Sequence, residues 1–236
     1  MNSVKNNLKT REFMLSAILF DLDGTLANTD PIHFKLWHNI LKDYDIELDQ
    51  DFYQKNISGN TNAQVVAKIL PTLSAQEGEQ MGIDKEAMYR KQAKTLSPTP
   101  GLEKIIALTD QIPLRRAVVT NAPRENAEHM LEALQLTETF PIVVVSDDAP
   151  PGKPDPAPYK LGLEKVGVAS SNAIAFEDST TGICSAVAAG IYTIGVASTH
   201  DPKLLLAAGA NMVIKDFNDP QLWAFLEQET SSSVAL

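Results

Sequence analysis

Six short apolar runs constrain the fold of this chain more than any other feature of its sequence. Most are rich in β-branched residues, and none alternates polar with apolar positions; they span residues 16–20, 117–120, 142–146, 173–176, 192–197 and 212–214. Unbroken apolar runs of this length are typical of strands that are buried on both faces of a parallel sheet. We therefore predict six parallel strands.

Helical patterns separate several of these runs. Apolar or small residues recur at positions i, i+3, i+4 and i+7 in two segments, Ala127, Met130, Leu131, Leu134 and Ile183, Ala186, Val187, Gly190. Strands that alternate with helices indicate an α/β fold, with helices on both faces of the sheet. The expected core is thus a doubly wound, Rossmann-like parallel sheet.

One long interval breaks this alternation, because no strand pattern occurs between Asp30 and Pro98. Helical spacing recurs there instead, in Phe34, Trp37, Leu41, Tyr44, in Val65, Val66, Ile69, Leu70 and over residues 85–95. Pro98 and Pro100 then mark the return to the α/β pattern. We expect an all-helical cap domain, residues 30–98, inserted after the first strand of a core made of residues 14–29 and 99–236. Residues 1–13 are polar, and we expect a disordered extension with Met14 as an alternative start.

Composition excludes several classes of function. The 236 residues include 30 acidic and 20 basic side chains, a formal net charge of −10, which disfavours binding to nucleic acid. The single cysteine, Cys184, excludes an internal disulfide and fits a reducing compartment. No apolar run is long enough to cross a bilayer, and the N-terminus lacks the pattern of a signal peptide. We expect a cytoplasmic monomer with neither a nucleic-acid nor a membrane partner.

Polar side chains follow four of the predicted strands, where a doubly wound sheet binds its ligands. Asp21 and Asp23 come directly after the first strand. Such a pair can hold a hard cation such as Mg²⁺, or can divide the roles of nucleophile and proton donor. The alternative is a solvated turn, since Asp-Gly is a common turn pair.

Three later strand ends carry the other candidates. Thr120 and Asn121 could hold phosphate oxygens at a helix N-terminus, or could only cap that helix. Lys153, in a proline-rich loop, is either a surface lysine or an ammonium that neutralises a phosphate. Glu177 and Asp178 either complete a metal site or, for Asp178, cap the next helix. Together they would supply every group that phosphoryl chemistry needs around one pocket.

This arrangement resembles the haloacid dehalogenase superfamily of aspartate-nucleophile phosphotransferases. DLDGT at 21–25 matches its first motif, and the later motifs resemble TN at 120–121, GKPDP at 152–156 and FEDSTTG at 176–182. HFKLW at 33–37 adds similarity to the branch of β-phosphoglucomutases and small sugar-phosphate phosphatases. The resemblance covers nearly the whole chain and includes a helical cap after the first strand.

The resemblance implies the chemistry of the first aspartates. Asp21 would attack phosphorus and form an aspartyl-phosphate. Asp23 would protonate the leaving alcohol and then activate the water that hydrolyses the intermediate.

The later motifs take the remaining roles that the resemblance implies. Thr120 and Asn121 would hold the phosphoryl group, and Lys153 would offset its charge. Asp178 would bind Mg²⁺ together with Asp21 and the backbone carbonyl of Asp23, and Glu177 would support that shell.

Residues of the cap bear on the choice between hydrolase and mutase. The resembling mutases use an arginine soon after a glycine to hold a second phosphate, but residues 58–64 here read SGNTNAQ, with Asn60 and no arginine. Thr25 also matches the phosphatases. Lys85 resembles a cap lysine that reaches the active site, although a solvated lysine is the alternative. His33 could contact Asp23 or a substrate hydroxyl, or could be a structural histidine.

We therefore expect a Mg²⁺-dependent phosphatase that acts on a small phosphorylated metabolite, such as a sugar or polyol phosphate. Two alternatives stay open: a β-phosphoglucomutase-like mutase, and a non-catalytic module that binds Mg²⁺ and phosphate. Cap shape and loop closure select the substrate, so the sequence leaves its identity open.

Overall fold

The fold is built on one parallel sheet. The computed structural model describes residues 15–112 and 114–231, so the extension expected at 1–13 and Met14 lie outside the described residues. Within them the sheet has six strands in the order β3-β2-β1-β4-β5-β6, and all neighbours are parallel. The strands are β1 (Ala17–Phe20), β2 (Arg115–Val119), β3 (Val143–Val144), β4 (Ala173–Glu177), β5 (Tyr192–Val196) and β6 (Met212–Ile214). Each of the six predicted strands is confirmed.

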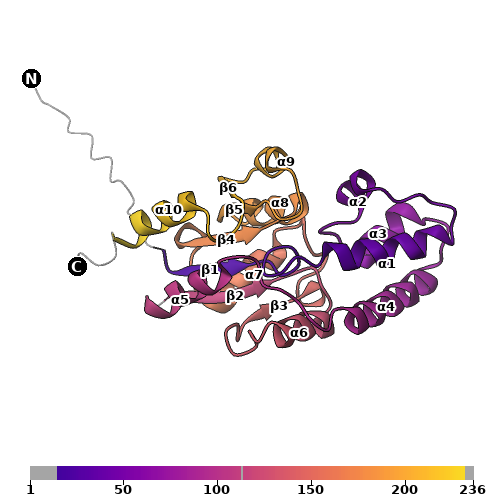
Figure 1. The fold of residues 1–236 in the computed structure, drawn as a ribbon, viewed down its shortest axis with the longest axis horizontal. Coiled ribbons are helices and arrows are strands. Elements are labelled where there is room, and N and C mark those ends of the chain that lie inside the picture. The colour runs from indigo at the N-terminus through magenta and orange to yellow at the C-terminus, as the bar shows by residue number, and fades with distance from the viewer. Residues whose placement is uncertain (1–14, 113, 232–236) are drawn as a thin grey trace, which may run out of the picture.

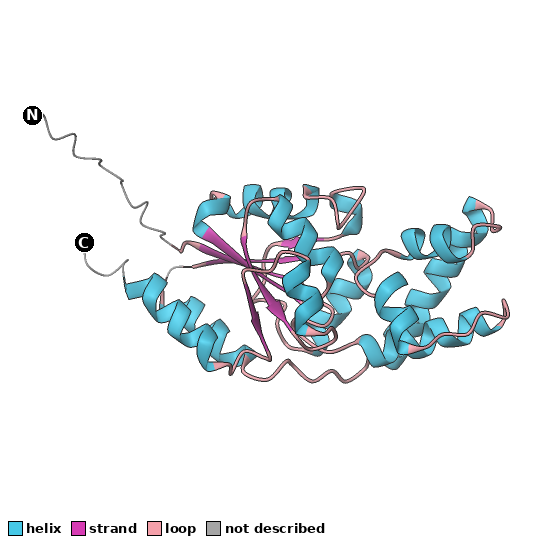
Figure 2. Ribbon diagram, turned by 90° about the horizontal axis from the view of Figure 1, so that it is seen from above, coloured by secondary structure: helices cyan, strands magenta, loops and turns pink. Residues whose placement is uncertain are grey.

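Helices cover both faces of this sheet (Figure 2). They are α5 (Leu102–Gln111), α6 (Arg124–Ala133), α7 (Ala157–Val166), α8 (Thr180–Ala188), α9 (Pro202–Ala207) and α10 (Pro220–Ser231), with short 3₁₀ helices η1 (Ser146–Asp148) and η2 (Ser170–Asn172). Successive strand residues point to opposite faces. Ile18 and Phe20 therefore pack with α5, α6 and α10, whereas Ala17 and Leu19 pack with α7 and α8. The doubly wound α/β prediction is confirmed.

Four helices lie between β1 and α5 in the sequence and gather at the end of the molecule away from both termini (Figure 1). They are α1 (Asp30–Lys42), α2 (Gln50–Asn56), α3 (Asn62–Ile69) and α4 (Ala75–Gln92). They share a hydrophobic cluster of their own that includes Trp37, Leu41, Tyr53 and Val65. This separate cluster supports a cap over residues 30–98, and the domain boundary stays a prediction.

The helix ends differ in places from the sequence expectation. Helix α2 was not predicted; it has seven residues, and the Asp49 side chain caps it by accepting the Phe52 N–H at 2.7 Å. Helix α4 begins ten residues before Lys85, because Ser74 and Glu77 form a capping box there. Helix α8 ends at Ala188, and Gly190 follows with a φ of +79° that no α-helix allows.

None of the described helices combines the length and the apolar character that a bilayer crossing requires.

The core on the α5 side of the sheet centres on Phe20, and this generates a stability prediction. Its ring stacks on Phe176 at a centroid distance of 5.3 Å and meets Phe140 edge-on at 5.4 Å. We expect Phe20→Ala to lower the free energy of unfolding by about 3–5 kcal/mol, since the cavity adds to the lost burial. Tyr44→Ala, at a side chain that is 40% exposed, should change it by less than about 0.5 kcal/mol. Urea titration of both variants measures this, and equal effects would contradict it.

Candidate active site

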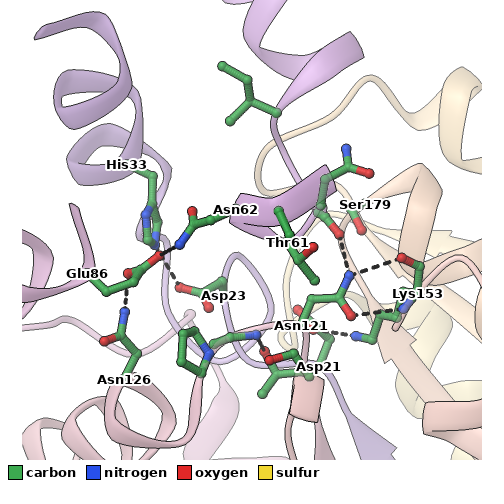
Figure 3. A pocket seen from close by; sticks show the side chains of 18 of the residues that line it. Asp21, Asp23, His33, Thr61, Asn62, Glu86, Asn121, Asn126, Lys153 and Ser179 are labelled. Carbon is green, nitrogen blue, oxygen red and sulfur yellow. Dashed lines mark hydrogen bonds and ion pairs between the residues drawn. The ribbon is translucent and has the colours of Figure 1, made fainter. Parts of the chain in front are cut away.

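A single cavity lies where the carboxyl ends of β1, β2 and β4 meet α1, α3 and α4 (Figure 3). All the acidic, amide and lysine candidates from the sequence line it except Glu177, which lies just behind it. The lining consists of Asp21, Asp23, His33, Trp37, Tyr53, Ile57, Gly59, Asn60, Thr61, Asn62, Ala63, Lys85, Glu86, Thr120, Asn121, Ala122, Pro123, Asn126, Ser146, Asp147, Lys153, Asp178 and Ser179.

The Lys153 ammonium joins three strand ends at the base of this cavity. Its Nζ donates to Asp21 Oδ1 at 2.6 Å, to Glu177 Oε1 at 2.5 Å and to the Val119 carbonyl at 2.7 Å. Lys153 is 2% exposed, so burial works against its charge, but Asp21 and Glu177 outweigh burial and raise the pKa of Lys153. The lysine is therefore held as a cation inside the protein, and the surface alternative is wrong for this residue.

Asp21, Glu177 and Asp178 form a buried acidic cluster, with carboxylate oxygens within 4.8 Å of one another. Burial, and then Glu177, raise the pKa of Asp21 to about 8 despite Lys153. Burial and the neighbouring Asp21 also raise the pKa of Asp178 well above its usual range. One ammonium cannot balance three carboxylates, so an additional cation would be strongly favoured here.

The donor set fits Mg²⁺, which binds to carboxylate oxygens. Gly24 also fits this assignment: it has a φ of +79°, and a Cβ at this position would lie 2.0 Å from Asp178 Oδ2. Only a glycine lets the backbone after Asp23 approach the Asp178 carboxylate so closely.

Asp23 is partly buried and its Oδ1 accepts two hydrogen bonds. Thr29 Oγ1 donates at 2.6 Å, and His33 Nε2 lies at 3.3 Å. Burial would raise the pKa of Asp23, but the bonds from His33 and Thr29 outweigh burial and lower it. The sequence hypothesis that His33 contacts Asp23 matches this geometry, although its role stays a prediction.

His33 also connects Asp23 to Lys85. Lys85 Nζ lies 2.9 Å from His33 Nδ1, and the His33 ring stacks on Tyr89 at 4.3 Å. Because an ammonium only donates, His33 Nδ1 accepts, and Nε2 carries the proton that faces Asp23. Lys85 is 4% exposed, so the alternative of a solvated lysine is wrong.

This chain of contacts continues to Glu86, which the sequence reasoning missed. Glu86 Oε1 accepts from Lys85 at 2.7 Å and from Asn62 at 2.6 Å, and Oε2 accepts from Asn126 on α6. Burial would raise the pKa of Glu86, but Lys85, His33 and Asn62 together outweigh burial and lower it, so Glu86 is ionised. The sequence signal was only its position next to Lys85.

The two phosphate-binding candidates that follow β2, Thr120 and Asn121, make different contacts. Thr120 Oγ1 is buried and accepts the Ala122 N–H at 3.0 Å. Asn121 Oδ1 accepts the Lys153 N–H at 2.9 Å, and its Nδ2 donates to the carbonyls of Lys153 and Gly59. The Asn121 side chain therefore fixes the Lys153 backbone and contacts the loop before α3.

Asn60 and Asn62 both line the cavity but face different partners. Asn60 Nδ2 donates to the Ser58 carbonyl at 3.2 Å, within its own loop. Asn62 instead faces Glu86, and residues 59–64 supply no cation. The sequence showed no arginine in this segment, and the side chain that it directs toward Glu86 is the neutral amide of Asn62.

Comparisons with known proteins agree with this geometry. A phosphorylated carbohydrates phosphatase from Thermotoga maritima is 29% identical over 85% of this chain and 94% of its own. A β-phosphoglucomutase from Bacillus subtilis is 25% identical over 87% of this chain and 91% of its own. The crystal structure of a HAD hydrolase, family IA, variant 3, from Entamoeba histolytica aligns with a TM-score of 0.78 and 29% identity, over 91% of this chain and 100% of that chain.

A sequence model of the haloacid dehalogenase-like hydrolases matches residues 18–196, which run from the second residue of β1 to the end of β5 and include all the acidic candidates. The match covers well over half of the chain and contains each motif on which the resemblance was based. This chain belongs to the haloacid dehalogenase-like hydrolase family.

Proposed function

We propose that this protein is a Mg²⁺-dependent phosphomonoester hydrolase that acts on a small sugar or polyol phosphate through an aspartyl-phosphate on Asp21. The observation that carries the proposal is the buried Asp21 carboxylate, which Lys153 holds at 2.6 Å in the cavity that Asp23 also lines. The Thermotoga maritima relative, named for phosphorylated carbohydrates, supports the substrate class.

The two aspartates divide the work in this proposal. Asp21 attacks phosphorus as the bond to the leaving oxygen breaks. Asp23, whose lowered pKa leaves it ionised in the free enzyme, first takes up a proton from solvent and then gives it to that oxygen. A water molecule then attacks the phosphoryl group as its bond to the Asp21 oxygen breaks, which releases phosphate and the Asp21 carboxylate, and Asp23 takes the proton of that water. Both hydrogen bonds to Asp23 go to Oδ1, which leaves Oδ2 without a partner among the described residues and available to the leaving group.

Charge balance assigns the supporting roles. Attack of a carboxylate on a phosphate dianion is repulsive unless cations screen it. Lys153 supplies one cation; Mg²⁺, held by Asp21, Asp178 and the Asp23 carbonyl with Glu177 in support, would supply two further positive charges when bound. The Thr120 hydroxyl and the backbone around Asn121 would hold phosphoryl oxygens at the start of α6. The substrate is the only partner that this mechanism requires, and a cytoplasmic monomer stays our prediction.

The Asp21→Asn variant tests the chemistry. We expect Mg²⁺-dependent phosphate release from a panel of hexose, pentose and glycerol phosphates and phosphoglycolate, and a loss of about 10³-fold or more in this variant, because the amide is a poor nucleophile. Asp51→Asn, at an exposed position of α2 outside the cavity, should retain the wild-type rate. Wild-type turnover by Asp21→Asn would overturn the mechanism, and zero turnover by the wild type would favour a binding module.

Metal binding has a readout that does not depend on turnover. Asp21 and Asp178 have raised pKa values in the fold, so the metal-free protein should lose stability as pH rises from about 4 toward 8. At pH 7.5, Asp178→Asn should raise the melting temperature without Mg²⁺, because the raised pKa of Asp178 makes its burial beside Asp21 unfavourable at this pH and an amide removes that cost.

Mg²⁺ should stabilise the wild type and not this variant. At about ten times its Kd it should stabilise the wild type by about 1.4 kcal/mol and leave Asp178→Asn unchanged. Thermal unfolding at several Mg²⁺ concentrations measures both effects, with Asp51→Asn as the control. An equal Mg²⁺ response in wild type and Asp178→Asn would rule out this ligand set.

A phosphomutase is the second candidate, favoured by the Bacillus subtilis β-phosphoglucomutase among the relatives. The absence of a cationic side chain at residues 58–64 counts against it, because a mutase must hold a second phosphate. Incubation of β-glucose 1-phosphate with a bisphosphate primer separates the two. Glucose 6-phosphate as the main product would indicate a mutase, and free phosphate a hydrolase.

A further inference from the structure

The charges at the far end of the cavity have a pattern that the hydrolase proposal does not use. The described cavity lining contains two lysines, Lys85 and Lys153, and no arginine. Lys153 is bound to Asp21 and Glu177, and Lys85 is bound to Glu86. Every lysine of this lining is therefore already paired with a carboxylate, and none is left for a second anion on the substrate.

Glu86 lies where a leaving group would extend. In Figure 3, Asn121 and Lys153 lie on one side of Asp23, Glu86 and Asn126 lie on the other, and the Asn62 amide points toward Glu86. A phosphoryl group at Asp21 places its leaving oxygen near Asp23, so the rest of the substrate points toward Glu86. This end is built from α3, α4 and α6, and Glu86 is only 6% exposed.

The hydrogen-bonding capacity of this end suits hydroxyl groups. The Glu86 carboxylate accepts three bonds from Lys85, Asn62 and Asn126, and has about four acceptor positions. One acceptor remains on Oε2 for a hydroxyl, and each of the two amides has a second N–H that can donate. An anionic group at the same place would face a buried carboxylate in a region of low dielectric.

We propose that Glu86, with Asn62 and Asn126, makes this enzyme selective for phosphate monoesters whose leaving group is neutral and hydroxylated, and selects against leaving groups that carry a carboxylate or a second phosphate. The inference rests on the proposed function, whose substrate class it narrows. It assigns Glu86 as a specificity-determining residue at the leaving-group end.

Two matched substrate pairs test the selectivity. Glycerol 3-phosphate and 3-phosphoglycerate differ by a hydroxymethyl group against a carboxylate, as do glucose 1-phosphate and glucuronic acid 1-phosphate. We expect the wild type to favour the neutral member of each pair by about tenfold or more in kcat/KM. A wild-type ratio near one for both pairs would overturn the inference.

Variants of Glu86 separate its charge from its bulk. Glu86→Gln keeps the size, removes the charge and frees the Lys85 ammonium, so the neutral-to-anionic ratio should fall by about tenfold. Glu86→Asp keeps the charge and should preserve the ratio. Glu79→Gln makes the same change in net charge at an exposed position of α4 and should leave the ratio and rate unchanged. An unchanged ratio in Glu86→Gln would contradict the assignment.

A second variant and a second substrate keep the outcomes distinct. If Glu86→Gln does not fold, Asn62→Lys adds a cation at the same end and should lower the ratio, and no change there would overturn the inference. Hydrolysis of p-nitrophenyl phosphate that is lost in Asp21→Asn reports on the chemistry alone. If this ester is hydrolysed and the neutral and anionic substrates of each pair have equal kcat/KM, only the selectivity is rejected. No hydrolysis of any ester would reject the proposed function and the inference together.

Discussion

The Lys153 ammonium is the interaction on which the rest of this structure depends. It bonds to the ends of three strands, through Asp21 of β1, the Val119 carbonyl of β2 and Glu177 of β4. Without it, adjacent strand ends would carry uncompensated buried carboxylates, which cost several kcal/mol each. The Asn121 side chain holds the Lys153 backbone at both its N–H and its carbonyl. Two kinds of contact therefore fix the proline-rich loop. The ammonium of Lys153 forms ion pairs, and its backbone forms hydrogen bonds with the Asn121 side-chain amide.

A second set of contacts extends this charge balance away from the sheet. Hydrogen-bond distances connect Asp23 to His33, His33 to Lys85 and Lys85 to Glu86. Asn126 then connects Glu86 to α6 of the core. The proposed proton donor and the leaving-group end are therefore electrostatically coupled. A change at Glu86 alters the partner of Lys85, and through His33 it alters the hydrogen bond that lowers the pKa of Asp23. The proposed substrate selection and the proposed proton transfer would therefore depend on one connected set of residues.

The sequence predicted the sheet because the apolar runs are buried on both faces, and a run such as 173–176 admits few other structures. It predicted the acidic cluster because parallel strand ends converge at one edge of a sheet. It missed α2, whose seven residues are too few for a periodic signal. It missed Glu86 because a glutamate on a polar helix is normally exposed, and only the approach of α3 and α6 buries it. Of the two asparagines near the start of α3, Asn60 contacts its own loop, whereas Asn62, which the sequence did not single out, contacts Glu86; local spacing does not encode this difference.

Charge over the whole cavity then limits what this fold can accept as a substrate. The acidic cluster exceeds its one lysine, so in the proposed mechanism a divalent cation would be needed before a phosphate dianion could approach Asp21. That cation and the dianion nearly cancel, which leaves the cavity no reserve of positive charge. The remaining ammonium, on Lys85, is neutralised by Glu86. A second anionic group would therefore enter an excess of negative charge, whereas a hydroxyl group would only exchange hydrogen bonds with water for hydrogen bonds with Glu86 and two amides. The electrostatics that would call for a metal at the proposed phosphoryl end would thus also favour a neutral, hydroxylated molecule at the other.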